Sequence, residues 1–208
     1  MRAIGLGPWS KNAKYCTGCF RVLRQSHGGA EVDCSLLFAD VRGSTAIAER
    51  MRPREFNRLM GRFYDTATDV LVRHEAIVDK FVGDEIIGVF IPAMTGGLHA
   101  RAALAAAVEL LERTGHGPSR QPWVPVGAGV NTGLAYVGAI GAGPDTELTA
   151  MGDVVNTTAR LASAAGAGEI LVTEQAAAEA GLASSSVERR SLELKGKSES
   201  VGVLVVRP

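Results

Sequence analysis

The stretch Leu36–Thr45, LLFADVRGST, predicts a buried strand that ends in a turn suited to binding a ligand. Its apolar residues predict a strand that carries Asp40 to its end. Gly43 allows the backbone to approach a ligand closely, and the free N–H groups at the start of the following helix can bind phosphate. We therefore expect Gly43, Ser44 and Thr45 to contact phosphate.

A second carboxylate, Asp84, lies in the segment KFVGDE at residues 80–85, at the predicted tip of a hairpin. Hard cations such as Mg²⁺ take one or two carboxylates together with substrate oxygens. Either aspartate alone is explained as well by a solvated strand end or a turn. Together, Asp40 and Asp84 predict a site for divalent metal and polyphosphate.

The composition narrows the class of protein. With 208 residues and 46% apolar content, the chain can form one well-cored domain with a short extension. Its 22 basic residues balance 22 acidic ones, so we expect binding neither to nucleic acid nor to a membrane surface. It shows no apolar run of the ~18–20 residues that a membrane span needs, and no secretion signal in residues 1–10. Its three cysteines are too few for a disulfide framework, which favours a cytoplasmic location.

Three motifs in order resemble the signatures of class III nucleotidyl cyclases: FADVRGST, KFVGDE and, further on, MGDVVNTTAR. The resemblance covers residues 31–208 and leaves residues 1–30 as an N-terminal extension. It implies an enzyme that makes cyclic AMP or cyclic GMP from the nucleoside triphosphate. It also implies two metal ions per site, Mg²⁺ or Mn²⁺, held by Asp40, Asp84 and the backbone carbonyl of Val41.

The order strand, helix, hairpin, helix, strand predicts the split βαβ arrangement of ferredoxin-like folds. We expect an α+β fold with a ferredoxin-like βαββαβ core, added C-terminal strands and a helix, and a mixed, mainly antiparallel sheet. A turn at Asn131-Thr132-Gly133 is predicted to join two strands. The expected strands are 31–41, 76–81, 86–91, 123–131, 134–137, 169–172, 187–194 and 201–206, and the expected helices run to 74, over 95–113 and 153–165, and from 173 to 181.

Asn156 and Arg160 lie four residues apart and therefore project from one face of a predicted helix. A guanidinium suits a charge-rich phosphorus, and an amide can hold a ribose. Because Asn156 follows two valines, we expect it near the buried face with a partner. The alternative is a surface ion pair for Arg160 and a tolerated Asn156. The resemblance implies that they are the family's transition-state residues.

Base recognition is assigned by the resemblance to Lys80 and Thr149. A lysine donor matches the acceptor N1 of adenine, whereas guanine presents an N–H there. Thr149 stands where the commonest family pattern has Asp; its hydroxyl can accept from the adenine amino group but can also donate. With threonine at this position, the chain resembles a bacterial subgroup related to bicarbonate-responsive soluble cyclases. This resemblance implies adenylyl specificity and a response to bicarbonate. Lys195 matches a lysine that contacts the triphosphate, although a turn lysine can simply be solvated.

The N-terminal extension carries Cys16 and Cys19 in a CxxC pattern, with His27 downstream. Three readings stay open: structural or incidental cysteines, a zinc ion shared across a dimer, and a redox pair. We interpret all four histidines, which show no metal-ligand spacing, as structural.

The resemblance places the metal aspartates on one protomer and the base-reading and transition-state residues on the other. Because this chain carries both sets, we predict a homodimer with two interface active sites, acting on ATP. The alternatives are a guanylate or dual-specificity cyclase, or a catalytically silent regulatory module of the same fold.

Overall fold

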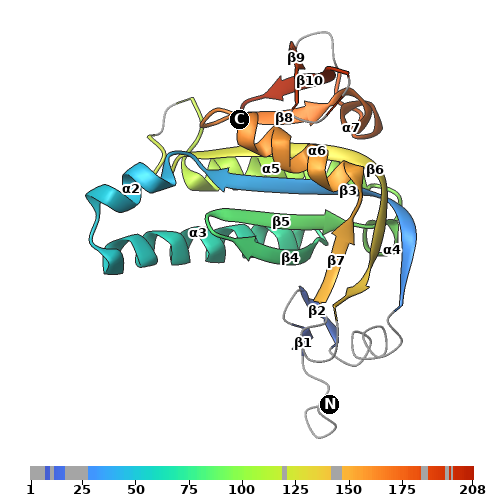
Figure 1. Cartoon of the computed structure of the whole chain (residues 1–208), viewed down its shortest axis with the longest axis horizontal. Helices are drawn as coiled ribbons and strands as arrows, with labels where there is room; N and C mark the ends of the chain where they lie inside the picture. The colour runs from blue at the N-terminus through green and yellow to red at the C-terminus, as the bar shows by residue number, and fades with distance from the viewer. Residues whose placement is uncertain are drawn as a thin grey trace, which may run out of the picture.

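The computed structural model of the chain describes residues 8–9, 12–16, 28–118, 121–141, 147–183, 187–194, 197 and 199–208, with side chains from residue 28 onward. Figure 1 shows the arrangement of its elements. The strands are β1 (Pro8–Trp9), β2 (Asn12–Cys16), β3 (Gly29–Val41), β4 (Ile77–Val82), β5 (Glu85–Phe90), β6 (Val126–Ile140), β7 (Glu147–Met151), β8 (Ile170–Thr173), β9 (Glu188–Leu192) and β10 (Val201–Val206). The helices are α2 (Ser44–Arg50), α3 (Pro53–Arg73), α4 (Pro92–Thr95), α5 (His99–Thr114), α6 (Asp153–Ala164) and α7 (Glu174–Glu179).

The main sheet has eight strands in the order β4-β5-β3-β6-β8-β10-β9, with β7 paired to the far end of β6. Its first four strands, β4-β5-β3-β6, have the order of a ferredoxin-like core, because β5 inserts antiparallel between β3 and β4. Only β6 and β8 pair in parallel among the described strand pairs. The predicted α+β class and the mainly antiparallel sheet are confirmed.

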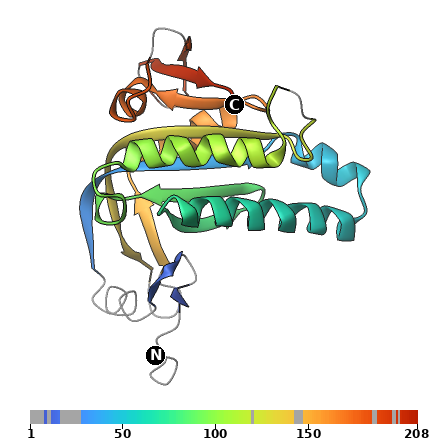
Figure 2. The same ribbon diagram turned by 180° about the vertical axis from the view of Figure 1, so that it is seen from behind.

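Helices cover both faces of the sheet. Figures 1 and 2 show α3 and α5 on one face and α6 on the other. The alternation along β3 explains this arrangement, because Leu37 and Ala39 face the α3 and α5 side. Leu36 and Phe38 instead join the cluster that includes Val154 of α6. Each face of the central strand is therefore apolar, as a sheet covered on both sides requires.

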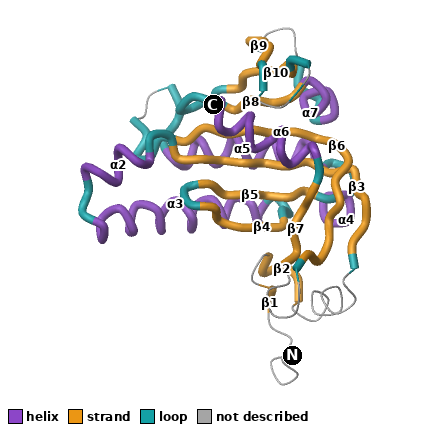
Figure 3. The backbone as a smooth tube through the Cα atoms, viewed as in Figure 1, coloured by secondary structure: helices purple, strands orange, loops and turns teal. Residues whose placement is uncertain are grey.

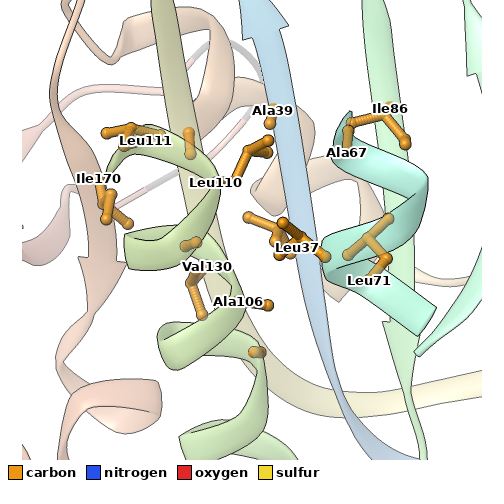
Figure 4. Close-up of a cluster of buried hydrophobic side chains, with 14 of the residues drawn as sticks. Leu37, Ala39, Ala67, Leu71, Ile86, Ala106, Leu110, Leu111, Val130 and Ile170 are labelled. Atoms are coloured by element: carbon orange, nitrogen blue, oxygen red, sulfur yellow. The ribbon is translucent and has the colours of Figure 1, made fainter. Parts of the chain in front are cut away.

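The larger core lies between β3, α3 and α5. Figure 4 shows Leu37 and Ala39 of β3 between Leu110 of α5 and Leu71 of α3. Leu37, Leu71 and Leu110 have no exposed surface. Burying one such side chain contributes roughly 1.5–3 kcal/mol. This packing fixes the strand that carries Asp40 near its end.

The predicted turn at residues 131–133 is wrong. β6 runs without interruption through these positions, and Figure 3 shows it as one long, bent strand. The cause is long-range pairing, since β3 matches β6 from Gly29↔Gly138 to Val41↔Val126. Asn131 accepts hydrogen bonds from the Thr132 backbone N–H and the Thr173 hydroxyl, each at 2.9 Å, so its polar group is satisfied inside a strand.

Most other elements agree with the sequence prediction. The β4–β5 hairpin and the β9–β10 hairpin are present, and the Thr173 side chain caps α7 by accepting from the Ala176 N–H. The second long helix begins at His99 rather than at Thr95, because α4 and the left-handed pair Gly96-Gly97 intervene. None of the helices in the described ranges combines the length and apolar character that crossing a bilayer requires.

Candidate active site

The two predicted metal aspartates lie at one edge of the sheet. Asp40 is the second-last residue of β3 and is opposite Glu85 of β5, while Asp84 occupies the β4–β5 turn. The Val41 N–H donates to the Asp84 carbonyl at 3.3 Å, which ties the strand end to the hairpin tip. Gly83, with φ +63°, allows the tight turn. The backbone segments that carry the two aspartates therefore meet at this edge, although they are far apart in the sequence.

The surroundings of Asp40 suit a cation. One carboxylate oxygen, Oδ2, forms an ion pair with Arg42. The other, Oδ1, is buried and has no hydrogen-bond partner among the described residues. A buried unsatisfied carboxylate oxygen is costly unless a ligand completes it. The described residues contain no group of three or more metal-binding side chains, so a cation here would also need oxygens from a substrate.

Arg42 connects this edge to α6. Its Nη1 donates to the Ser163 carbonyl at 2.9 Å. Burial lowers the pKa of the Arg42 guanidinium, and the nearby charges of Asp84 and Glu85 oppose that shift. Burial, followed by the charge of Asp84, raises the pKa of the Glu85 carboxyl to about 7. The carboxyl groups of Asp40, Asp84 and Glu85 outnumber the Arg42 guanidinium at this edge, and a divalent cation would offset their charge.

Tyr64 of α3 contacts the tip of the β4–β5 hairpin. Its hydroxyl donates to the Gly83 carbonyl, and its ring contacts Phe81 with centroids 4.7 Å apart. Burial and then the charge of Asp84 raise the pKa of the Tyr64 hydroxyl, so it remains a donor at neutral pH. None of the three sequence motifs contains Tyr64, so they did not predict this contact.

The predicted phosphate turn has the expected form. Gly43 adopts the left-handed conformation, φ +67°, immediately before α2, whose first residues are Ser44 and Thr45. A Cβ atom at Gly43 would meet nothing within 4 Å, so the turn is open. The N–H groups of the first helical turn have no partner within the helix and are available to an anion.

The two predicted base-reading residues lie together around an unpredicted third one. The Thr149 hydroxyl donates to Asp79 Oδ2 at 2.6 Å, and the Lys80 ammonium lies 3.9 Å from the same oxygen. Asp79 is only 3% exposed. Sequence reasoning missed this residue, although a charged side chain inside the run IVDKFV of β4 is the signal that identifies it.

Asn156 and Arg160 both lie on α6, as predicted. Asn156 is exposed, so the expectation that it lies near the buried face is wrong. The buried face of α6 is made by Val154, Thr157 and Thr158 instead. Arg160 is half-buried. The side chains of both residues belong to the outward part of the helix, where a ligand can reach them.

Three predicted residues, Lys195, Cys19 and His27, lie outside the described residues, and of Cys16 only the backbone, at the end of β2, is described. The other histidines all have structural partners. His74 contacts Glu109, His99 contacts Ser35 and His116 accepts from the Val126 N–H.

Solved structures of similar shape are nucleotide cyclases. The guanylyl cyclase Cya2 superimposes with a TM-score of 0.76 and 29% identity, covering 86% of this chain and 93% of that one. The adenylyl cyclase CyaB from P. aeruginosa gives a TM-score of 0.74 and 24% identity over 87% and 97% of the two chains. The fold is therefore common to enzymes named for different nucleotides.

Proteins of similar sequence include an uncharacterized protein and an adenylate cyclase. An uncharacterized protein of Mycobacterium tuberculosis is 31% identical over 155 residues, which cover 74% of this chain and 28% of that protein. The adenylate cyclase of Anabaena cylindrica is 28% identical over 183 residues, 83% of this chain and 36% of that protein. The matched region thus spans only 28% to 36% of the length of these relatives. The family described as "Adenylate and Guanylate cyclase catalytic domain" matches residues 29–206. Because this match covers most of the chain and the fold is common to both kinds of enzyme, the chain belongs to the class III adenylate and guanylate cyclase catalytic domains.

Proposed function

We propose that the chain is an adenylyl cyclase that converts ATP to 3′,5′-cyclic AMP and pyrophosphate at sites shared by two copies of itself. The observation that carries this proposal is the pairing of Lys80 and Thr149 around Asp79. A lysine donor and a threonine acceptor match N1 and the 6-amino group of adenine. Guanine presents the opposite pattern at both positions.

Asp40, Asp84 and the Val41 carbonyl are the residues that would hold Mg²⁺ or Mn²⁺. Two such ions, when bound, would lower the pKa of the ribose 3′-hydroxyl and neutralise the charge of the departing pyrophosphate. The unpartnered Asp40 Oδ1 supports this assignment. Gly43, Ser44 and Thr45 would orient the phosphates through backbone N–H groups, so that the 3′-hydroxyl can attack in line.

Arg160 and Asn156 would stabilise the reaction from α6. The guanidinium would face the oxygens of the pentavalent phosphorus, where charge accumulates, and the Asn156 amide would hold the ribose. Removing one such donor typically lowers kcat by about 10²–10³-fold. Lys195 would add a contact to the triphosphate.

A homodimer is supported by exposed apolar side chains next to the base-reading residues. Phe81 and Val82 follow Lys80 along the chain and are 47% and 51% exposed. Leu134, Tyr136 and Met151 are 60%, 38% and 55% exposed. Tyr136 pairs with Met151 across β6 and β7, next to Thr149. Exposed large apolar side chains of this kind favour a protein partner, and a second copy would bring its own Asp40 and Asp84 to the base-reading set.

The test is incubation of purified protein with ATP or GTP and Mn²⁺, scoring cyclic nucleotide and pyrophosphate. We expect cyclic AMP to exceed cyclic GMP in the wild type, and Lys80→Glu to lose this preference. Asp40→Ala is the control that should abolish both products. A wild type that prefers GTP would instead establish a guanylyl cyclase, and a wild type without product would establish a silent module. Adding bicarbonate to the same assay tests for stimulation by that ion.

A further inference from the structure

We propose that Asp79 is a positioning residue for base selectivity, which it exerts by fixing the direction of the Thr149 hydroxyl proton. The proposal rests on the adenylyl cyclase activity proposed above and adds the residue that makes Thr149 selective. Thr149 Oγ1 and Asp79 Oδ2 are 2.6 Å apart, within the range of a strong hydrogen bond to a carboxylate. The two residues come from β7 and β4, which are far apart in the sequence.

A threonine hydroxyl has one proton to donate and can accept through its lone pairs. An ionised carboxylate can only accept. Because Thr149 donates its proton to Asp79, its oxygen presents only lone pairs to a base in the site. Such an oxygen accepts from the 6-amino group of adenine and repels the 6-carbonyl oxygen of guanine. The ambiguity of a free hydroxyl is thereby removed.

Lys80 reinforces this arrangement. Burial of Asp79, which is 3% exposed, favours the neutral carboxyl, and the Lys80 ammonium, 3.9 Å from the same Asp79 oxygen, opposes that effect by favouring the ionised, acceptor-only form. The Lys80 side chain is 38% exposed, whereas that of Asp79 is 4% exposed. Lys80 is therefore accessible to a ligand, while Asp79 lies behind it and acts through its neighbours without touching the base.

The test compares kcat/KM for ATP and GTP in the wild type, Asp79→Ala, Thr149→Val and the double variant. The ratio within one protein is the readout, because partial unfolding lowers both values equally. We expect each single change to lower the ATP/GTP ratio about tenfold, the effect of one selective hydrogen bond. In the double variant no further loss is expected, because Asp79 acts only through the group already removed.

Purine riboside triphosphate separates Thr149 from Lys80, because it keeps the N1 acceptor and lacks only the 6-amino group. We expect Asp79→Ala to lower the preference for ATP over this analogue, and Thr149→Ser, which keeps the hydroxyl, to retain it. If Asp79→Ala proves insoluble, Asp79→Leu replaces it. The leucine side chain is close in size to that of aspartate and cannot accept the Thr149 proton, so the same loss is expected.

An unchanged ATP/GTP ratio in Asp79→Ala, or independent effects that multiply in the double variant, would overturn the proposal while leaving the cyclase activity intact. A wild type that forms no cyclic nucleotide would overturn the proposed function instead. The ratio of ATP to GTP dissociation constants, measured by calorimetry on the same four proteins, would then test the role of Asp79 by itself.

Discussion

Mixing two inactive variants tests whether the active site is shared between copies. Asp40→Ala removes a carboxylate from the sheet edge where Val41 contacts Asp84. Arg160→Ala removes a guanidinium from α6. If the metal-binding and transition-state sets come from different copies, a mixed dimer has one site with both lesions and one site with none.

The expected activity follows from this symmetry. Equal amounts of the two proteins that exchange freely give mixed dimers for half of the population, and each mixed dimer has one of its two sites intact. The mixture should therefore recover roughly one quarter of the wild-type activity at equal total protein. Mixed dimers isolated through two different affinity tags should recover about half. The assay is cyclic AMP formation at protein concentrations where the dimer is populated.

A matched control uses two lesions in the same set. Mixing Asp40→Ala with Asp84→Ala leaves every site of the mixed dimer without one carboxylate, so no activity should return. The reasoning is refuted if the Asp40→Ala and Arg160→Ala mixture is no more active than either protein alone. It is refuted equally if the control mixture recovers as much activity as the test mixture.

Three further predictions concern the packing and charge of the fold. Gly129→Ala should lower the free energy of unfolding in urea by about 1–3 kcal/mol, because its Cβ would lie 2.6 Å from the Ala162 nitrogen of α6. The control Gly61→Ala lies on α3, where a Cβ would meet nothing within 4 Å, and should raise it by about 0.5–1 kcal/mol. Hydrogen bonds, chiefly from Arg190, lower the pKa of the Glu169 carboxyl from 4.5 to about 2, so the ionised carboxylate stabilises the fold above pH 4.5 and this stabilisation is lost as the pH falls through 2. In urea unfolding, Glu169→Gln should be less stable than the wild type at pH 7, and the difference should vanish near pH 2. Burial raises the pKa of the Cys34 thiol to about 11, so iodoacetamide at pH 8 should label it only after unfolding, as peptide mass mapping would show.

The sequence predicted elements whose signals are local. The apolar run before Asp40, the turn around Gly83 and the Thr173 cap each depend on a few neighbouring residues, and all three are present. The prediction failed at Asn131-Thr132-Gly133, where turn-forming residues form the middle of a strand. Ser35 of β3 lies 2.6 Å from the Thr132 hydroxyl, a contact between strands that no local window contains. Long-range pairing outweighed local turn preference there.

In the candidate active site, too, local sequence predicts some features and long-range contacts determine others. The family resemblance predicted roles for Asp40, Asp84, Lys80 and Thr149 from their positions in the sequence. What a motif cannot give is the state of a side chain that depends on its neighbours in space. Asp79 and Thr149 are separated by 70 positions in the chain and meet because β7 comes to lie beside β4. Adenine and guanine differ at position 6 in the direction of the hydrogen bond that they form. Selectivity between them should therefore depend on which partner holds the Thr149 hydroxyl proton, which is a property of the Thr149–Asp79 contact and not of either residue alone. In this chain, Thr149 should therefore favour adenine only while the Asp79 carboxylate accepts its proton, which the paired Asp79 and Thr149 variants measure directly.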